Sequence, residues 1–179
     1  MDFKWYRGNK LILYSTFTYL VDAFADPESA FVGHQCQPWY NESLTAVKAW
    51  WAGELQTDEE VTEACSKAIK FYFKAIDDKA EQYFQRIHHL TLRLAPLATF
   101  WQTEATDLSY LPELKNISVP TQVLVGRHDF VAPISMSADI AQRIPGAKLS
   151  IFEASGHFAH VEEPKRFHRV IKQFVFDNG

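Results

Sequence analysis

Residues 119–129 read VPTQVLVGRHD, and residues 147–157 read AKLSIFEASGH. In each stretch an apolar, β-prone run leads into a loop with a glycine, and the loops end on Asp129 and on His157. A helical pattern that begins at a proline follows each loop. This alternation predicts a parallel α/β unit with right-handed crossovers and a sheet covered on both faces. Asp129 and His157 are then expected at the carboxyl ends of the strands, the edge where open α/β sheets bind ligands.

Earlier segments predict one more strand and a block of helices. Residues 10–16 are apolar and β-prone, which predicts a strand. Residues 17–41 contain Asp-Pro, Gly and Gln-Pro turn signals and predict irregular structure with short helical pieces. Residues 42–98 carry apolar side chains at helical spacing, which predicts several helices in succession.

Two helices in this block have clear start signals. Thr57 and Glu60 form a capping-box pattern, which predicts a helix that runs on through Tyr72. A later helix is expected to begin near Asp77 and to continue until Pro96 stops it.

Aromatic side chains are concentrated in the same block. At helical spacing such side chains usually pack against neighbouring helices, but several together also suit an apolar ligand pocket. The sequence leaves both interpretations open for Trp50, Trp51, Phe71, Tyr72, Phe73, Tyr83, Phe84, Phe100 and Trp101.

Composition excludes several classes of protein. A chain of 179 residues with 47% hydrophobic residues can bury a core of its own. Its net charge of −4 and the lack of a Lys/Arg-rich run argue against nucleic-acid binding. No apolar run is long enough for a membrane span, and the first residues do not form a signal peptide. Cys36 and Cys65 lack metal-ligand spacing, so we predict a reduced, cytoplasmic setting with no metal and no cofactor.

The two loop motifs, with the Glu162-Glu163-Pro164 segment that follows them, resemble the α/β-hydrolase superfamily and within it the proline iminopeptidase-like members and related esterases. The resemblance implies the C-terminal part of an α/β-hydrolase fold: a short parallel sheet with flanking helices plus a helical cap. Residues 1–16 then hold the end of the core sheet before the cap. Residues 17–116 form the helical cap, and residues 117–179 form the C-terminal α/β-hydrolase core.

By this resemblance Asp129 is the acid of a catalytic triad and His157 is its general base. The chemistry fits, because an imidazole titrates near neutral pH and a carboxylate on its other nitrogen fixes the tautomer. A single Asp after a strand is more often a turn former, and a single His is more often a surface or core residue. The two motifs in this order favour the catalytic interpretation. Gly156 is expected to permit a tight turn before the histidine.

The nucleophile of such a triad is missing. It normally lies in a Gly-x-Ser-x-Gly elbow, and no two of the seven glycines are four positions apart. Only nine residues precede Lys10, too few for the strand, elbow and helix that come first in the family. Ser155 shares a loop with His157 and is poorly placed to be its nucleophile. We therefore expect a hydrolase part that is inactive alone.

The substrate class and the partners stay open. The resemblance implies a small-molecule or peptide substrate, cleaved at an ester or N-terminal peptide bond through an acyl-serine. Phe130 stands where iminopeptidases of the tricorn-associated type carry an acid for the substrate amine, and only an acid such as Glu104 could compensate. The alternative is a non-catalytic binding module derived from a hydrolase. We expect either self-association through the strand at 10–16 or a complementing N-terminal half.

Overall fold

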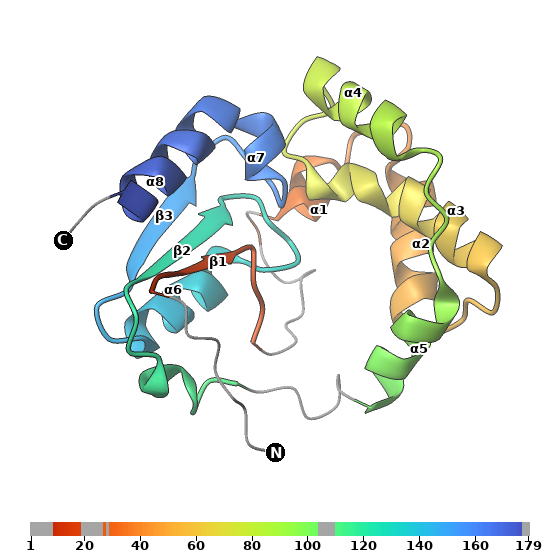
Figure 1. The fold of residues 1–179 in the computed structure, drawn as a ribbon. Helices are drawn as coiled ribbons and strands as arrows, with labels where there is room; N and C mark the ends of the chain where they lie inside the picture. Colours follow the sequence, from red (N-terminus) through yellow and green to blue (C-terminus); the bar gives the residue numbers. More distant parts are fainter. Residues whose placement is uncertain (1–8, 19–26, 28, 104–109, 177–179) are drawn as a thin grey trace.

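The computed structural model describes residues 9–18, 27, 29–103 and 110–176, with residues 100–103 described by their backbone alone. Three strands and their covering helices form one side of the molecule, and a further group of helices forms the other (Figure 1). In chain order the elements are β1 Leu11–Tyr14, α1 Ala30–Gly33, α2 Tyr40–Trp51, α3 Asp58–Ala68, η1 Ile69–Tyr72, α4 Asp78–Ile87, α5 Leu94–Thr103, η2 Leu114–Asn116, β2 Thr121–Gly126, α6 Ile134–Arg143, β3 Lys148–Phe152, α7 Ala159–Glu162 and α8 Pro164–Phe176.

The sheet is parallel, with strand order β1-β2-β3. Leu13 of β1 lies opposite Val123 of β2, which in turn lies opposite Leu149 of β3. Every residue of β2 is buried, as expected for the central strand of a parallel sheet with helices on both faces. The predicted short parallel sheet is therefore confirmed.

Successive side chains of β2 point to opposite faces of the sheet, and a different helix covers each face. Val123 packs in a cluster with Met136 and Ile140 of α6. Leu124 packs on the other side with Phe152 and with Phe167 of α8. These two apolar layers fix the strand ends from which the loops with Asp129 and His157 emerge.

The helices between β1 and β2 begin largely where the sequence places them. Thr57 caps α3, its hydroxyl accepting from the backbone N–H of Glu60 while the Glu60 carboxylate accepts from the N–H of Thr57. The capping box is thus confirmed. The α-helix ends at Ala68, however, and a 3-10 turn continues to Tyr72, so Tyr72 does not share the helix predicted to run through it.

The helix predicted to run from Asp77 to Pro96 is in fact two helices. α4 ends at Ile87, and α5 begins at Leu94 with Pro96 in its first turn. Proline is tolerated there because the first N–H groups of a helix have no partner within it. The Asp58 carboxylate accepts from the Leu94 N–H at 2.8 Å, so a contact from α3 stabilises a helix start that local periodicity does not reveal.

Aromatic packing joins this helical segment (residues 30–103) to the loops of the sheet. Phe31 and Phe71 form a buried cluster with Phe130, which comes from the loop after β2. Phe73 lies in a second cluster, against which the partly buried Phe158 packs from the loop after β3. The core interpretation therefore holds for Phe71 and Phe73, whereas the side chains of Phe100 and Trp101 lie outside the described residues.

Candidate functional site

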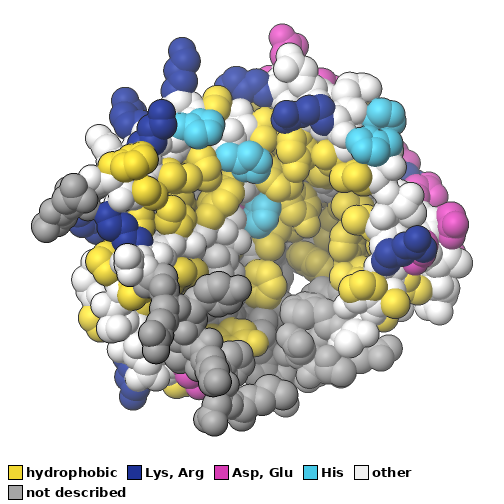
Figure 2. All heavy atoms as spheres, viewed as in Figure 1, with side chains coloured by type: hydrophobic (Ala, Val, Ile, Leu, Met, Phe, Trp, Pro, Cys, Tyr) yellow, Lys and Arg dark blue, Asp and Glu magenta, His cyan; other side chains and the backbone are white. Residues whose placement is uncertain are grey.

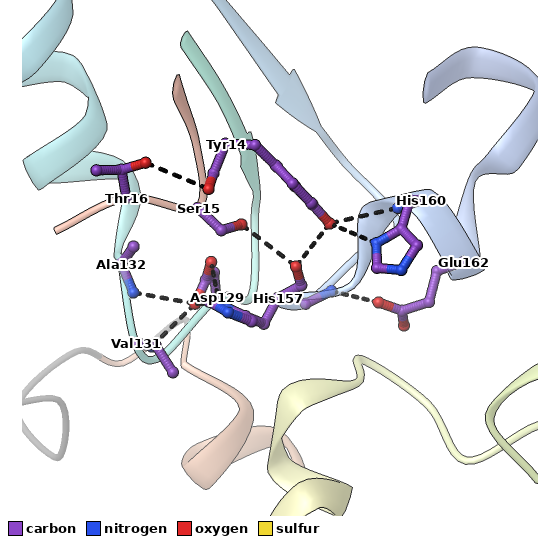
Figure 3. Close-up of polar contacts among 10 residues, drawn as sticks. Tyr14, Ser15, Thr16, Asp129, Val131, Ala132, His157, His160 and Glu162 are labelled. Carbon is purple, nitrogen blue, oxygen red and sulfur yellow. Dashed lines mark hydrogen bonds and ion pairs between the residues drawn. The ribbon is translucent and has the colours of Figure 1, made fainter. Parts of the chain in front are cut away.

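Asp129 is held in a tight turn just beyond the end of β2. Its Oδ1 accepts hydrogen bonds from the backbone N–H groups of Val131 at 2.9 Å and Ala132 at 3.0 Å (Figure 3). The residue is 1% exposed. Buried carboxylates need hydrogen-bond partners, and here the turn itself supplies two of them.

The backbone of His157 is fixed from two other parts of the chain. Its N–H donates to the carbonyl of Tyr72, the last residue of η1, at 2.7 Å. Its carbonyl accepts from the Tyr14 hydroxyl at 2.7 Å and from the Ser15 hydroxyl at 3.3 Å, both at the end of β1 (Figure 3). The histidine loop is thus held in place between the sheet and the helical segment.

The structure brings the two predicted residues together. Nδ1 of His157 lies 3.0 Å from both carboxylate oxygens of Asp129. The aspartate side chain is fully buried, whereas 20% of the histidine side chain is exposed. Among the described residues none bonds to Nε2, the other ring nitrogen. A carboxylate on Nδ1 and an accessible Nε2 are what a histidine general base requires.

Two glycines let the loops approach so closely. A Cβ at Gly126 would collide with the backbone carbonyl oxygens of Ser155 and Gly156, and a Cβ at Gly156 would collide with the Tyr72 carbonyl. The sequence predicted that Gly156 permits a tight turn, and the residue lies in a bend flanked by turn residues, although its φ is not positive. Its missing side chain also makes room for neighbouring backbone.

Aromatic rings surround the imidazole of His157. The Tyr72 ring meets it edge-on with centroids 5.2 Å apart, and the Phe158 ring lies at 5.3 Å. Burial raises the pKa of the Tyr72 hydroxyl above its ordinary value. Phe130, 3% exposed, packs 5.0 Å from Tyr72 and 4.6 Å from Phe31 and so serves the core. Glu104, the acid considered as its substitute, lies outside the described residues.

Residues 37–164 match the sequence profile of the alpha/beta hydrolase fold family. The chain belongs to this family. The profile spans both Asp129 and His157.

Solved hydrolase structures share the fold. An alpha/beta fold family hydrolase from Bacillus anthracis superposes with a TM-score of 0.67 at 21% identity, over 93% of this chain and 58% of its own. The esterase RhEst1 from Rhodococcus also gives a TM-score of 0.67, at 19% identity, over 96% of this chain and 57% of its own. This chain of the alpha/beta hydrolase fold family therefore spans less than two thirds of either structure.

Curated relatives match shorter stretches. A 2-hydroxymuconate semialdehyde hydrolase of Pseudomonas putida is 36% identical over 70 residues, which are 39% of this chain and 23% of the relative. A proline iminopeptidase of Saccharolobus solfataricus is 38% identical over 69 residues, 38% of this chain and 22% of the relative. A putative carbamate hydrolase of Pseudomonas syringae is 31% identical over 101 residues, 55% of this chain and 36% of the relative. The chain covers less than two thirds of each.

An acidic pair supports the histidine loop of this alpha/beta hydrolase fold. Oε2 of Glu163 accepts from the Ala154 N–H at 2.9 Å and from the Ser155 hydroxyl at 2.7 Å. Ser155 is fully buried and its hydroxyl is engaged, in line with its exclusion as a nucleophile. Glu162 accepts from the Gly156 N–H at 2.7 Å. The sequence contained a signal for both roles, two acids between the histidine and Pro164, but it did not reveal which atoms they bind.

A Tyr–His contact lies behind the site and was not predicted. The Tyr14 hydroxyl, besides donating to the His157 carbonyl, lies 3.1 Å from Nδ1 of His160 and accepts from the His160 backbone N–H at 3.3 Å. Burial raises the pKa of Tyr14 and lowers the pKa of His160. Both groups thus stay neutral near pH 7 and act as hydrogen-bond partners rather than charges.

Other site types find no support in the described part of the chain. Within residues 9–18, 27, 29–103 and 110–176, no group of three or more His, Cys, Asp or Glu side chains is arranged to hold a metal ion. None of the helices in those ranges has the length and apolarity needed to cross a membrane.

Proposed function

We propose that this chain supplies the acid–base half of a serine-type hydrolytic site. In this proposal His157 takes the proton of a nucleophilic hydroxyl through Nε2, and Asp129 holds the ring and stabilises the imidazolium that forms. The observation that carries the proposal is the contact of Nδ1 with both Asp129 oxygens at 3.0 Å, in a histidine whose side chain is 20% exposed.

The nucleophile in this proposal comes from a complementing segment, defined here as a polypeptide with a Gly-x-Ser-x-Gly elbow. The 179-residue sequence contains no such motif. Two serine hydroxyls beside the histidine loop are engaged in other hydrogen bonds, since Ser155 donates to Glu163 and Ser15 donates to the His157 carbonyl. The chain alone is then inactive because an Asp–His pair has no hydroxyl to activate.

The proposed division of the chain follows the family. Residues 1–16 carry the last sheet strand before the cap, residues 17–116 form the cap, and residues 117–179 complete the core. Figure 2 shows hydrophobic side chains around a hollow on the face shown, with histidine side chains among them.

The substrate we propose is an uncharged ester or amide with an apolar acyl group. The aromatic surroundings of His157 favour apolar groups. Phe130 is buried and cannot form a salt bridge with a free amine, which argues against the iminopeptidase subtype despite the similarity to the Saccharolobus protein. The named relatives act on different bonds by their descriptions, so they do not narrow the substrate further.

The proposal is tested by supplying the complementing segment from an esterase of this fold. The chain is purified alone and together with that segment. Each sample is assayed with p-nitrophenyl acetate and with prolyl-β-naphthylamide, and is labelled with a fluorophosphonate probe. We expect labelling and ester hydrolysis only in the complemented sample. A stable complex that neither labels nor hydrolyses would favour the non-catalytic binding module, and turnover by the chain alone would contradict the need for a second segment.

A further inference from the structure

One carboxylate joins the histidine loop to the helical segment. Oε2 of Glu162 accepts from the backbone N–H of Gly156 at 2.7 Å, and Oε1 accepts from the backbone N–H of Lys74 at 2.8 Å. Gly156 directly precedes His157, and Lys74 lies two residues after Tyr72. Glu162 is the last residue of α7, and Figure 3 shows its side chain directed at the loop of His157.

A second contact joins the same two backbone segments. The His157 N–H donates to the Tyr72 carbonyl at 2.7 Å. The segments at 72–74 and 156–157 are thus bonded directly at one point and through the Glu162 carboxylate at another. With two contact points on each segment, the two segments can neither separate nor rotate against each other. The Tyr72 ring and the His157 ring therefore keep their edge-on arrangement.

We infer that Glu162 is a positioning residue that couples the placement of Tyr72 and the helical segment to the orientation of His157. Its relevance to catalysis rests on the proposed function, whereas the coupling itself rests on the two hydrogen bonds alone. Glu163 differs, because its Oε2 binds the Ala154 N–H and the Ser155 hydroxyl, and among the described residues its side chain forms no hydrogen bond to the helical segment.

The charge of Glu162 controls how well it can bind both N–H groups. A carboxylate offers two equivalent acceptor oxygens, whereas a carboxylic acid turns one of them into a donor. Burial raises the pKa of Glu162 to about 7, against the opposing effect of the backbone N–H groups that bind it. The carboxylate of Asp77 also raises this pKa. Lys79, whose Nζ donates to the Glu162 carbonyl at 2.6 Å, is the nearby cation on α4.

The test is a pH titration of the purified chain followed by 1H–15N NMR at the backbone amides of Gly156 and Lys74. We expect both amide protons to shift together with one midpoint near pH 7, downfield as the carboxylate forms. We also expect Glu162→Gln to abolish this shared transition and to speed hydrogen exchange at Lys74 roughly tenfold, as the loss of a charge-assisted bond implies. One midpoint shared by two amides that lie far apart in the sequence would show that a single titrating carboxyl group binds both segments.

Two further variants test whether the shared transition belongs to Glu162. Glu163→Gln should leave the shared transition of Gly156 and Lys74 in place. Glu162→Asp should keep the transition at no more than one of the two amides, because the shorter side chain cannot reach both. Separate midpoints, or an unchanged titration in Glu162→Gln, would overturn the inference. Shared titration in a protein that stays inactive when complemented would instead overturn the proposed function, and the wild-type titration needs no variant to fold.

Discussion

Asp129 and His157 lie 28 positions apart in the chain, yet Nδ1 of the histidine is 3.0 Å from each of the two carboxylate oxygens. Oδ1 also accepts hydrogen bonds from the N–H groups of Val131 and Ala132, so these bonds fix the orientation of the carboxylate independently of the histidine ring. A histidine held in this way donates through Nδ1 and leaves Nε2 unprotonated, the tautomer that accepts a proton from a hydroxyl.

Replacing the acid by its amide tests that orientation. In Asp129→Asn the side-chain oxygen can keep the two turn N–H groups, which leaves the NH2 group facing Nδ1. The histidine must then accept a hydrogen bond at Nδ1 and carry its proton on Nε2. A protonated Nε2 cannot take the proton of a nucleophilic hydroxyl, so the ring no longer acts as a base. We expect kcat of the complemented protein to fall by roughly three to four orders of magnitude, with little change in the unfolding midpoint.

The matched control for Asp129→Asn is Asp139→Asn, which removes a carboxylate from an i,i+4 pair with Arg143 on α6. That variant should keep kcat within roughly twofold, because surface pairs of this kind contribute little to stability. The tautomer can be read directly from the 15N shifts of the His157 ring. An Asp129→Asn protein with wild-type kcat would show that the contact has no part in the reaction.

The close approach of the two loops predicts a steric penalty at Gly126. A Cβ there would collide with the carbonyl oxygens of Ser155 and Gly156, and both are backbone atoms that cannot swing aside. We expect Gly126→Ala to lower the free energy of unfolding by about 2 kcal/mol or more, as overpacking in a rigid site does. Chemical denaturation monitored by circular dichroism measures this.

Gly33→Ala is the control for the same substitution, since nothing lies within 4 Å of a Cβ at Gly33. It should be neutral or should stabilise by roughly 0.5 kcal/mol, because alanine restricts the unfolded chain. Equal effects of the two substitutions would mean that the loops have room to separate.

Local patterns in the sequence predict much of the sheet unit. The runs at 121–125 and 148–152 and the prolines at 133 and 164 mark strands and helix starts, and the structure confirms each of them. Local rules succeed there because the apolar runs are short and are bounded by turn residues. The order of Asp129 and His157 also predicted that they would meet, since the ends of neighbouring parallel strands share one edge.

The sequence was less informative where contacts between residues far apart in the chain determine the local structure. The spacing of apolar residues predicted one helix that continues to Pro96, but the Asp58 carboxylate stabilises a new helix start at Leu94. Gly156 was predicted only as a turn residue, and the sequence did not reveal that its missing side chain also makes room for the Tyr72 carbonyl. Neither Asp58 nor Tyr72 is near its partner in sequence, so no local pattern could reveal these contacts. Glu162 was visible only as part of a motif, because its role depends on where Lys74 lies.

Stability should depend on pH through Glu162. Its pKa is raised from the ordinary 4.5 to about 7 in the folded chain, so the folded state binds this proton more tightly than the unfolded state. The free energy of unfolding should therefore fall as the pH rises from about 4.5 to about 7 and stay low above that range. The size of this contribution is on the order of 3 kcal/mol.

Comparing wild type with Glu162→Gln isolates this effect, because glutamine does not titrate. Urea unfolding between pH 4.5 and 8 should show the wild type losing stability relative to the variant as the pH rises. A constant difference between the two proteins across this range would contradict the raised pKa.

The outer edge of β1 predicts that copies of this chain associate with one another. In the described part of the chain β1 pairs with β2 alone. Leu11 and Ser15 donate toward β2, so the alternate N–H groups of Ile12 and Tyr14 point to the other edge. Lys4 and Arg7, which the sequence suggested as weak protection, lie outside the described residues. We expect dimers or larger species at tens of micromolar in sedimentation velocity, roughly where exposed edges associate.

Substitutions at Ile12 test whether this edge is responsible. Ile12→Ala and Ile12→Pro both remove the packing of Ile12 against the cluster beneath α8, but only proline also removes the edge N–H. Association should weaken in Ile12→Pro relative to Ile12→Ala. A monomeric wild type, or equal association of both variants, would show that another surface is used or that the edge is covered.

The central claim is that His157 is the base of a hydrolytic site, and fluorophosphonate labelling of the complemented protein tests it most directly. His157→Ala is compared with His168→Ala, which removes an exposed histidine on α8 whose Nδ1 bonds the Pro164 carbonyl. We predict that the rate of labelling and of p-nitrophenyl acetate hydrolysis falls at least roughly a thousandfold in His157→Ala and is unchanged in His168→Ala. A His157→Ala protein that labels and turns over at close to the wild-type rate would contradict the account.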